Sequence, residues 1–236
     1  MPTLIDYCPV AFGVEVVADR WSLLVVRELL SGATRFNDIH RGLPGLSRTL
    51  LSARLRQLEA HGVIERRPRD PSRGSTYHLT PAGQDLRGVV TALGEWAVRW
   101  TLPEPRPNQL DNALLLWRMR AGLRRDALPP SPVVVEFIFS SGTPRRGWLI
   151  VDQRDPSACV RDPGFPVDLC VTGGSREWHE IWIGRRDLSE TVRDGVITIE
   201  GAPKLARQFT NWFRLNDFAP FVRSRTISGG ESLTPS

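Results

Sequence analysis

Cysteines, lysines and long apolar runs are scarce in this chain of 236 residues. The three cysteines, Cys8, Cys159 and Cys170, are too few and too scattered to predict a disulfide framework or a zinc site. No run of about 18 apolar residues indicates a membrane-spanning helix, and the first residues lack the basic and apolar regions of a signal peptide. We therefore expect a reduced, cytoplasmic protein without metal, cofactor or membrane association.

Only one of the 31 basic residues, Lys204, is a lysine, so any contact with phosphate would come almost entirely from arginine. Arginine presents forked donors that suit phosphate oxygens. The net charge is +5, and eight arginines lie between residues 41 and 73, against three acidic residues. Hydrophobic residues (41%) and charged residues (24%) are ordinary for a globular protein, which excludes a disordered chain. The basic character is concentrated in one short segment.

Prolines divide the chain. Pro103, Pro105 and Pro107 alternate with other residues, a pattern that excludes a helix and favours an extended spacer. The predicted parts are an N-terminal domain, a proline-rich linker, a C-terminal domain and a disordered tail rich in Ser, Thr and Gly, at residues 1–102, 103–108, 109–223 and 224–236.

A predicted helix follows Ser47, which is a good N-cap residue, and ends near Gly62. Leu51, Leu55 and Leu58 share one of its faces, and small polar residues and arginines occupy the other. Small side chains allow close approach to base edges, and arginine donates to guanine or phosphate. An ordinary amphipathic surface helix would show the same pattern, so this helix alone decides nothing.

The segment after this helix favours the first interpretation. Residues 63–67 and 75–79 predict two strands joined by a basic turn. A helix-turn-helix followed by a basic hairpin is the arrangement of a winged helix, in which a helix enters the major groove and the hairpin contacts the flanking backbone or minor groove. The alternative is a solvated hairpin. The predicted DNA-contacting residues are Arg35, Ser47, Arg48, Thr49, Ser52, Arg56, Arg67, Arg69 and Arg73.

A long helix begins after Thr80, with a wide apolar stripe from Leu86 to Trp100. Such a stripe needs a partner, which could be the first helix of the same subunit, a second subunit or the C-terminal domain. Because operators are usually read by two-fold symmetric dimers, we expect a homodimer bound to double-stranded DNA.

Many short motifs in residues 7–100 resemble the HxlR-type branch of the MarR-like winged-helix transcriptional regulators. Among them are Cys8-Pro9-Val10, Asp19-Arg20-Trp21-Ser22, Arg35-Phe36-Asn37-Asp38-Ile39, Leu43-Pro44-Gly45-Leu46-Ser47 and Tyr77-His78-Leu79-Thr80-Pro81. The resemblance implies a homodimeric bacterial DNA-binding protein whose reading helix starts at Ser47 and whose wing spans residues 66–74.

In some members of this family a cysteine near the N-terminus senses oxidants or electrophiles, and Cys8 matches its position. A sensing thiol needs access and a lowered pKa, for which Arg20 or Arg27 could supply positive charge. The simpler interpretation, which we prefer, is a cysteine packed at the start of the first helix.

The C-terminal half predicts an α+β domain with a five-stranded sheet and helices over one face. Short connections between its strands favour antiparallel pairing. The run of two helices, a strand and a helix from Glu177 to Leu205 resembles the sterol carrier protein-like lipid-binding fold, which implies an apolar pocket for a hydrophobic effector. The predicted pocket residues are Trp117, Phe137, Trp148, Trp178, Trp182, Phe209, Trp212 and Phe213. Aromatic stripes of this kind can equally be plain core.

Three functions follow from these patterns. The first is a transcriptional regulator that responds to a ligand. The second is an enzyme, for which His179 beside Glu180 is the only hint and a weak one, since helix neighbours do not face each other. The third is a constitutive DNA-binding protein whose C-terminal domain dimerises or docks another protein. We favour the first.

Overall fold

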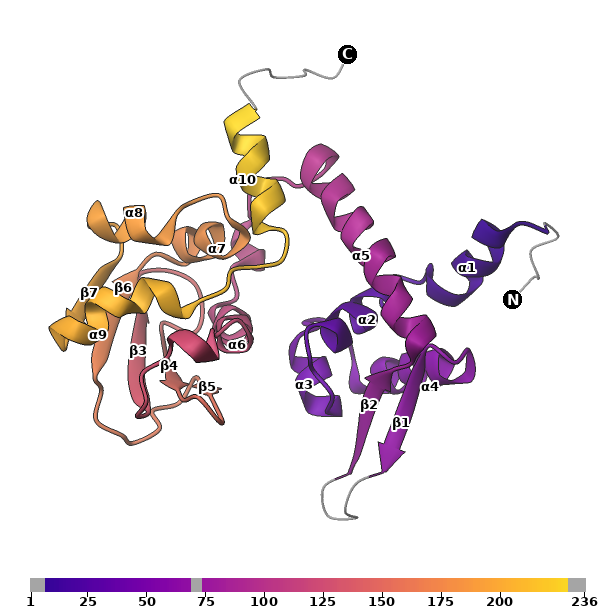
Figure 1. Ribbon diagram of the computed structural model, residues 1–236, viewed down its shortest axis with the longest axis horizontal. Coiled ribbons are helices and arrows are strands. Elements are labelled where there is room, and N and C mark those ends of the chain that lie inside the picture. Colours follow the sequence, from indigo (N-terminus) through magenta and orange to yellow (C-terminus); the bar gives the residue numbers. More distant parts are fainter. Residues whose placement is uncertain (1–6, 69–73, 229–236) are drawn as a thin grey trace. The chain divides into compact units, whose positions relative to one another are not determined.

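The computed structural model describes residues 7–68 and 74–228, apart from the side chains of the last few of these residues (Figure 1). Contacts within the chain separate two compact units, Met1–Leu93 and Gly94–Ser236, and the boundary falls inside one long helix. Each unit is considered by itself. Among the described residues, every helix is either too short or too polar to cross a membrane.

The first unit contains helices and a two-stranded hairpin. In chain order they are α1 (Pro9–Val17), α2 (Ser22–Leu30), α3 (Phe36–Arg41), α4 (Arg48–Ala60), β1 (Ile64–Pro68), β2 (Ser75–Leu79) and α5 (Pro81–Trp100). Strands β1 and β2 are antiparallel, with Ile64 opposite Leu79. The backbone before α3 adds to the hairpin, because Arg35 bridges Thr76 and the amide of Tyr77 donates to the carbonyl of Thr34 at 2.8 Å. The expected winged helix-turn-helix is confirmed.

Leucine burial orients α4. Leu51, Leu55 and Leu58 are almost completely buried against Val25 and Val26 of α2. Removing one such side chain from water contributes about 1.5–3 kcal/mol, so turning the helix over would cost several times that amount. The leucine face predicted from the spacing is therefore the inner face.

Side-chain caps fix the helix ends on either side of the hairpin. The hydroxyl of Ser47 accepts a hydrogen bond from the amide of Leu50 at 3.2 Å, which confirms it as the N-cap of α4. Gly62 follows α4 with a φ of 68°, a conformation that favours glycine. Thr80 accepts from the amide of Gly83 at 3.2 Å and donates to the carbonyl of Gly62 at 2.6 Å, so one side chain ties the start of α5 to the end of α4.

The second unit is an α+β fold with a five-stranded sheet, as expected. Its strands are β3 (Val133–Phe139), β4 (Arg146–Val151), β5 (Ser157–Cys159), β6 (Leu169–Gly173) and β7 (Thr198–Gly201), in the order β5-β4-β3-β6-β7. Its α-helices are α6 (Asn112–Ala121), α7 (Ser175–Ile183), α8 (Leu188–Arg193), α9 (Pro203–Gln208) and α10 (Ala219–Ser228). Its short 3-10 helices are η1 (Pro107–Gln109), η2 (Arg125–Ala127) and η3 (Phe209–Trp212). Helices α6 and α7 and the segment η3 pack on one face of the sheet (Figure 1).

Two expectations for this unit are wrong. Strand β6 runs parallel to β3, with Phe137 opposite Val171, because the chain leaves β5 at the sheet edge and crosses to the far side of β3 before pairing again. The tail was expected to be irregular from Ser224, but α10 continues to Ser228, since Ala219 and Val222 are buried and anchor the helix. Residues 229–236 lie outside the described part.

Aromatic rings fill the space between the sheet and its helices. The ring of Phe137 on β3 lies 5.4 Å from that of Trp178 on α7, with the two rings edge to face. Phe209 contacts Trp212 and Phe213 at 5.6 and 5.1 Å in the same way. Edge-to-face pairs add about 0.5–1.5 kcal/mol each to the area that they bury, so this cluster is the main apolar core of the unit.

A buried polar network fixes the starts of α6 and α7 to the β3–β4 loop. The side-chain amide of Asn112 donates to the carbonyls of Ser141 and Pro144 at 3.1 and 2.9 Å. The hydroxyl of Ser175 lies 2.7 Å from the Asn112 amide oxygen, to which it can donate. Both Asn112 and Ser175 are fully buried, so these bonds have no water to replace them.

We predict that Asn112→Ala destabilises the second unit by about 1–3 kcal/mol, because it leaves two buried carbonyls and one hydroxyl without their partner. Urea denaturation followed by tryptophan fluorescence measures the loss. Asn211→Ala, at an exposed position of the same unit, is the matched control. An unchanged midpoint in Asn112→Ala would contradict the structural role of the network.

Candidate nucleic-acid interface and apolar cavity

The outer face of α4 carries the predicted reading residues. Arg48, Thr49 and Arg56 are exposed and Ser52 is half-buried, on the side opposite the leucine stripe. The structure thus brings these four side chains together on one helix face. A face of small residues and arginine can approach base edges closely while its guanidinium groups donate hydrogen bonds.

Arg48 also has a partner within the protein. Its guanidinium donates to the side-chain oxygen of Asn37 on α3 at 2.9 Å and lies 5.8 Å from the ring centre of Phe36. These contacts set the position of the Arg48 side chain and link α3 to the start of α4. Because a guanidinium has five donors, the bond to Asn37 leaves donors for an external acceptor. Sequence reasoning missed Asn37, since residues eleven apart on different helices share no periodicity.

Two other predicted residues have structural roles here. The Ser47 hydroxyl is the α4 cap, and a hydrogen bond to Leu50 occupies it. Arg35 is exposed at the N-cap of α3, in the short extended stretch that pairs with β2 at Thr76. Arg35 therefore lies at the base of the hairpin, beside the strand that leads to its tip.

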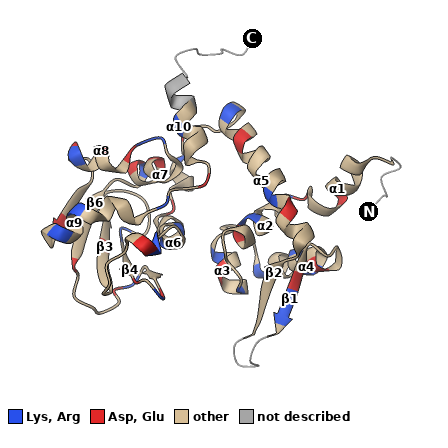
Figure 2. Ribbon diagram, in the orientation of Figure 1, with Lys and Arg blue, Asp and Glu red and all other residues tan. Residues whose placement is uncertain are grey.

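The hairpin carries mixed charge along β1. Glu65, Arg66 and Arg67 are all exposed, and the guanidinium of Arg67 is paired with the Glu65 carboxylate, with the Arg67 Nε 2.8 Å from the carboxylate oxygen. Figure 2 shows basic residues on α3 and β1 in this unit. The predicted contacts Arg69 and Arg73, at the tip, lie outside the described residues.

Large apolar side chains are exposed along α1 and α5. On α5, the side chains of Val89, Leu93, Trp96 and Trp100 follow one another at spacings of four, three and four, and each is about half exposed. On α1, Val10, Phe12 and Val14 are exposed as well. Contiguous apolar surface of this kind on a helix marks an interaction site more often than a solvated face.

Cys8 lies at the N-cap of α1, half-buried, and its carbonyl accepts from the amide of Phe12 at 3.1 Å. The arginines expected to lie beside it have other contacts. Arg20 lies over the ring of Trp21 at 5.0 Å, and Arg27 is paired with the Glu28 carboxylate. Redox sensing by Cys8 stays a prediction.

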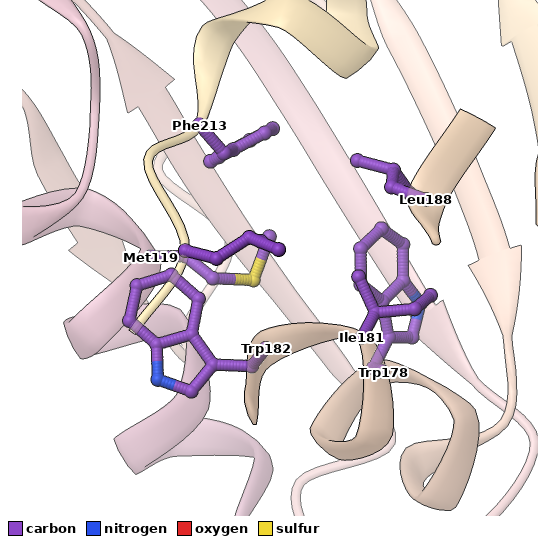
Figure 3. Close-up of a pocket in the computed structure, with 7 residues that line it drawn as sticks. Met119, Trp178, Ile181, Trp182, Leu188 and Phe213 are labelled. Carbon is purple, nitrogen blue, oxygen red and sulfur yellow. The ribbon is translucent and has the colours of Figure 1, made fainter. Parts of the chain in front are cut away.

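An apolar cavity lies beneath α7 in the second unit. Figure 3 shows six of its lining side chains, which come from α6, α7, α8 and the segment after η3. The complete lining is Met119, Trp178, Ile181, Trp182, Leu188, Phe213 and Leu215. The free space is about 10 Å³, which holds at most a single water molecule.

A wider and more polar cavity adjoins the first and shares Leu188, Phe213 and Leu215 with it. Its volume is about 390 Å³, within the usual range of ligand sites. Two ion pairs lie on its wall: Arg214 with Asp217 at 3.7 Å and Arg223 with Asp187 at 3.6 Å. The two cavities together offer an apolar inner end and a charged mouth.

The eight predicted pocket residues separate into three groups. Trp178, Trp182 and Phe213 line the apolar cavity, and sequence reasoning missed its other four lining residues. Phe137, Phe209 and Trp212 belong to the closed core. Trp148 shares the sheet face of Glu136, opposite to Phe137, and Trp117 lies under the guanidinium of Arg120, so neither reaches the cavity. The spacing on α7 identified its own cavity face, but Met119, Leu188 and Leu215 come from separate segments that no periodicity connects.

His179 and Glu180 do not form a catalytic pair. The Nδ1 atom of His179 lies 2.7 Å from the carbonyl of Ser175, and burial lowers the pKa of the imidazole, so the ring is neutral at pH 7. The carboxylate of Glu180 is bound by Arg186 at 2.6 Å. Among the described residues, no group of three or more His, Cys, Asp or Glu side chains is arranged to hold a metal ion.

Comparison with known proteins identifies the first part of the chain. The family model of the HxlR-like helix-turn-helix matches residues 16–105. The HTH-type transcriptional regulator YvaP of Bacillus subtilis is 39% identical over 93 residues, which are 39% of this chain and 85% of that protein. An HTH-type transcriptional regulator of Synechocystis is 39% identical over 95 residues, covering 39% of this chain and 70% of the relative.

Solved structures similar to this chain include the redox regulator HypR in its reduced form. It is 30% identical, with 38% of this chain and 90% of that chain covered and a TM-score of 0.36. The reduced form of the transcriptional regulator YodB from B. subtilis is 27% identical, with 42% and 100% covered and a TM-score of 0.37.

The relatives are named as transcriptional regulators with a helix-turn-helix, and their similarity extends over the unit that carries α4 and the hairpin. By this homology the protein is a DNA-binding transcriptional regulator. Through residues 16–105 the chain belongs to the HxlR-like helix-turn-helix family.

Proposed function

We propose that the protein is a homodimeric, sequence-specific regulator whose C-terminal unit binds a hydrophobic small molecule as its effector. The observation that carries the DNA-binding part is the orientation of α4: its leucines are buried, and its polar and arginine-bearing face is open beside a basic hairpin. We assign α4 as the reading helix and the β1–β2 hairpin as the wing.

The residues of this surface divide by the contact they can make. Arg56 and Ser52 project from the middle of α4, where a helix in the major groove meets base edges. Arg48 starts the helix, and its bond to Asn37 holds it at a position that suits a phosphate. Arg67, Arg69 and Arg73 belong to the hairpin and are assigned to the flanking backbone or minor groove.

We predict that Arg56→Ala relaxes sequence preference, with a loss of about 1–3 kcal/mol on specific DNA only. Arg73→Ala should instead weaken binding evenly on all sequences and reduce the salt slope by about one. Gel shifts on specific and random duplexes, at several salt concentrations, separate the two effects. Arg193→Ala, an exposed arginine in the second unit, is the matched control. Equal losses on both duplexes for Arg56→Ala would reject its reading role.

The exposed apolar stripe of α5, together with that of α1, supports homodimerisation. A second copy would cover Leu93, Trp96 and their neighbours with the same residues of its own α5, as two-fold symmetry requires. A dimer also presents two reading helices, which is how helix-turn-helix proteins commonly match operators with two half-sites.

We predict that the double variant Leu93→Glu and Trp96→Glu is a folded monomer. Both side chains are about half exposed in the single chain, so charges there leave the fold intact but are costly inside an interface. Sedimentation velocity at micromolar concentration measures the oligomeric state. Arg87→Glu, a charge reversal at an exposed position of the same helix, is expected to remain dimeric. A monomeric wild-type protein would refute the proposal.

The C-terminal unit is assigned as a sterol carrier protein-like effector domain. The support is its sheet with helices on one face, the apolar cavity under α7 and the adjoining cavity of about 390 Å³. An effector acts as a switch only if it binds the DNA-competent and incompetent conformations unequally. The small inner volume favours one alternative, a constitutive regulator whose C-terminal unit dimerises or docks a protein.

We predict that the freshly purified protein retains an apolar molecule, because a ligand that fills such a cavity dissociates slowly. Native mass spectrometry would detect it as an added mass that disappears under denaturing conditions. If the chain is empty, and its thermal stability does not respond to a panel of fatty acids and sterols, the constitutive alternative replaces this proposal.

A further inference from the structure

The proline segment is attached to the second unit along its first half. The guanidinium of Arg185 is paired with the Glu104 carboxylate and donates to the carbonyls of Leu102 and Pro103 at 3.3 and 2.9 Å. Arg176 donates to the carbonyl of Pro105 at 3.1 Å and lies 3.6 Å from Glu104. Two arginines therefore hold residues 102–105, and this segment is not a free spacer.

Both arginines belong to α7 or the turn after it, and a buried carboxylate stabilises them. Glu180 on α7 is only 9% exposed and lies 3.8 Å from Arg176. The carbonyl of Glu180 accepts from the amide of Arg185 at 2.8 Å, and its carboxylate binds Arg186. The position of Arg185 is thus set by α7 itself, so a movement of this helix moves the arginines with it.

The opposite side of α7 forms the cavity wall. Trp178, Ile181 and Trp182 line the apolar cavity, and helical spacing places them across the helix from Arg176 and Glu180. Since the free volume is about 10 Å³, nothing larger than a water molecule enters without displacing a wall. One of those walls is the helix that holds the proline segment.

We propose that α7 couples the cavity to residues 102–105, so that a ligand which enlarges the cavity displaces α7 and releases the segment from Arg176 and Arg185. Because α5 leads directly into this segment, its release changes how the second unit is tethered to the DNA-binding unit. The inference rests on the proposed effector function for its biological meaning, but its two physical steps can be tested without a ligand.

The first experiment tests the attachment. Backbone order parameters from ¹⁵N relaxation at Leu102 and Glu104 should be near those of a rigid backbone, about 0.85, and fall below about 0.6 in the double variant Arg176→Ala and Arg185→Ala. The exposed pair Arg193→Ala and Arg207→Ala is the matched control and should change neither value. If the double variant does not fold, Glu104→Ala, at an exposed position, should give a partial loss of order. A wild-type segment that is already flexible would overturn the proposal.

The second experiment tests the coupling. Leu215→Trp adds bulk to the cavity lining and should lower the order parameters at Leu102 and Glu104, whereas Leu205→Trp, on α9 and outside the lining, should not. Leu215→Phe is the milder variant if the larger ring prevents folding. A rigid segment in a folded Leu215 variant would overturn the coupling.

The third experiment follows DNA affinity. Leu215→Trp should change the dissociation constant by a factor of about five or more, as coupled sites commonly do, and the change should vanish in the Arg176→Ala and Arg185→Ala background. A change that persists there would refute transmission through the two arginines. A failed effector proposal would show instead as an empty cavity in native mass spectrometry, so the two failures are distinguishable.

Discussion

The burial of three leucines of α4 against α2 is the contact on which the DNA-binding surface depends. With Leu51, Leu55 and Leu58 inside, the remaining face of α4 has to be outside, and the order of residues places Arg56 and Ser52 there. The Ser47 cap and the Thr80 bonds then fix where the helix begins and how the hairpin leaves it. Reading chemistry on one face is thus a consequence of hydrophobic burial on the other.

The same division of labour between faces recurs on α7 in the second unit. Its apolar side, with Trp178 and Ile181, closes the cavity, and its charged side, with Arg176 and Glu180, holds the proline segment. A helix packed in this way cannot change one contact without straining the other, because close-packed interiors shift as units. The first unit uses the two faces of a helix to present a surface, and the second uses them to connect a cavity with a tether.

Sequence patterns predicted what depends on local periodicity. The buried leucines of α4, the Ser47 cap and the hairpin strands follow from spacing and turn chemistry, and the structure confirms them. The parallel pairing of β6 with β3 did not follow, because register between distant strands is decided by the path of the connection rather than by either strand. Nor did the cavity, since Met119 and Leu215 meet Trp182 only through the tertiary fold. The contacts of Arg176 and Arg185 with the proline segment were missed for the same reason.

The core of the second unit also shows why such a cavity can open. The indole nitrogens of Trp178, Trp182 and Trp212 are buried, and none has a hydrogen-bond partner in the described part of the chain. Each buried donor without a partner costs about 1–3 kcal/mol, so the aromatic packing is less stabilising than its area suggests. Two of these rings, Trp178 and Trp182, stand on the cavity wall of α7. A helix held by apolar contacts that carry this penalty is easier to displace than one in a fully satisfied core, and that is the property a coupling element needs.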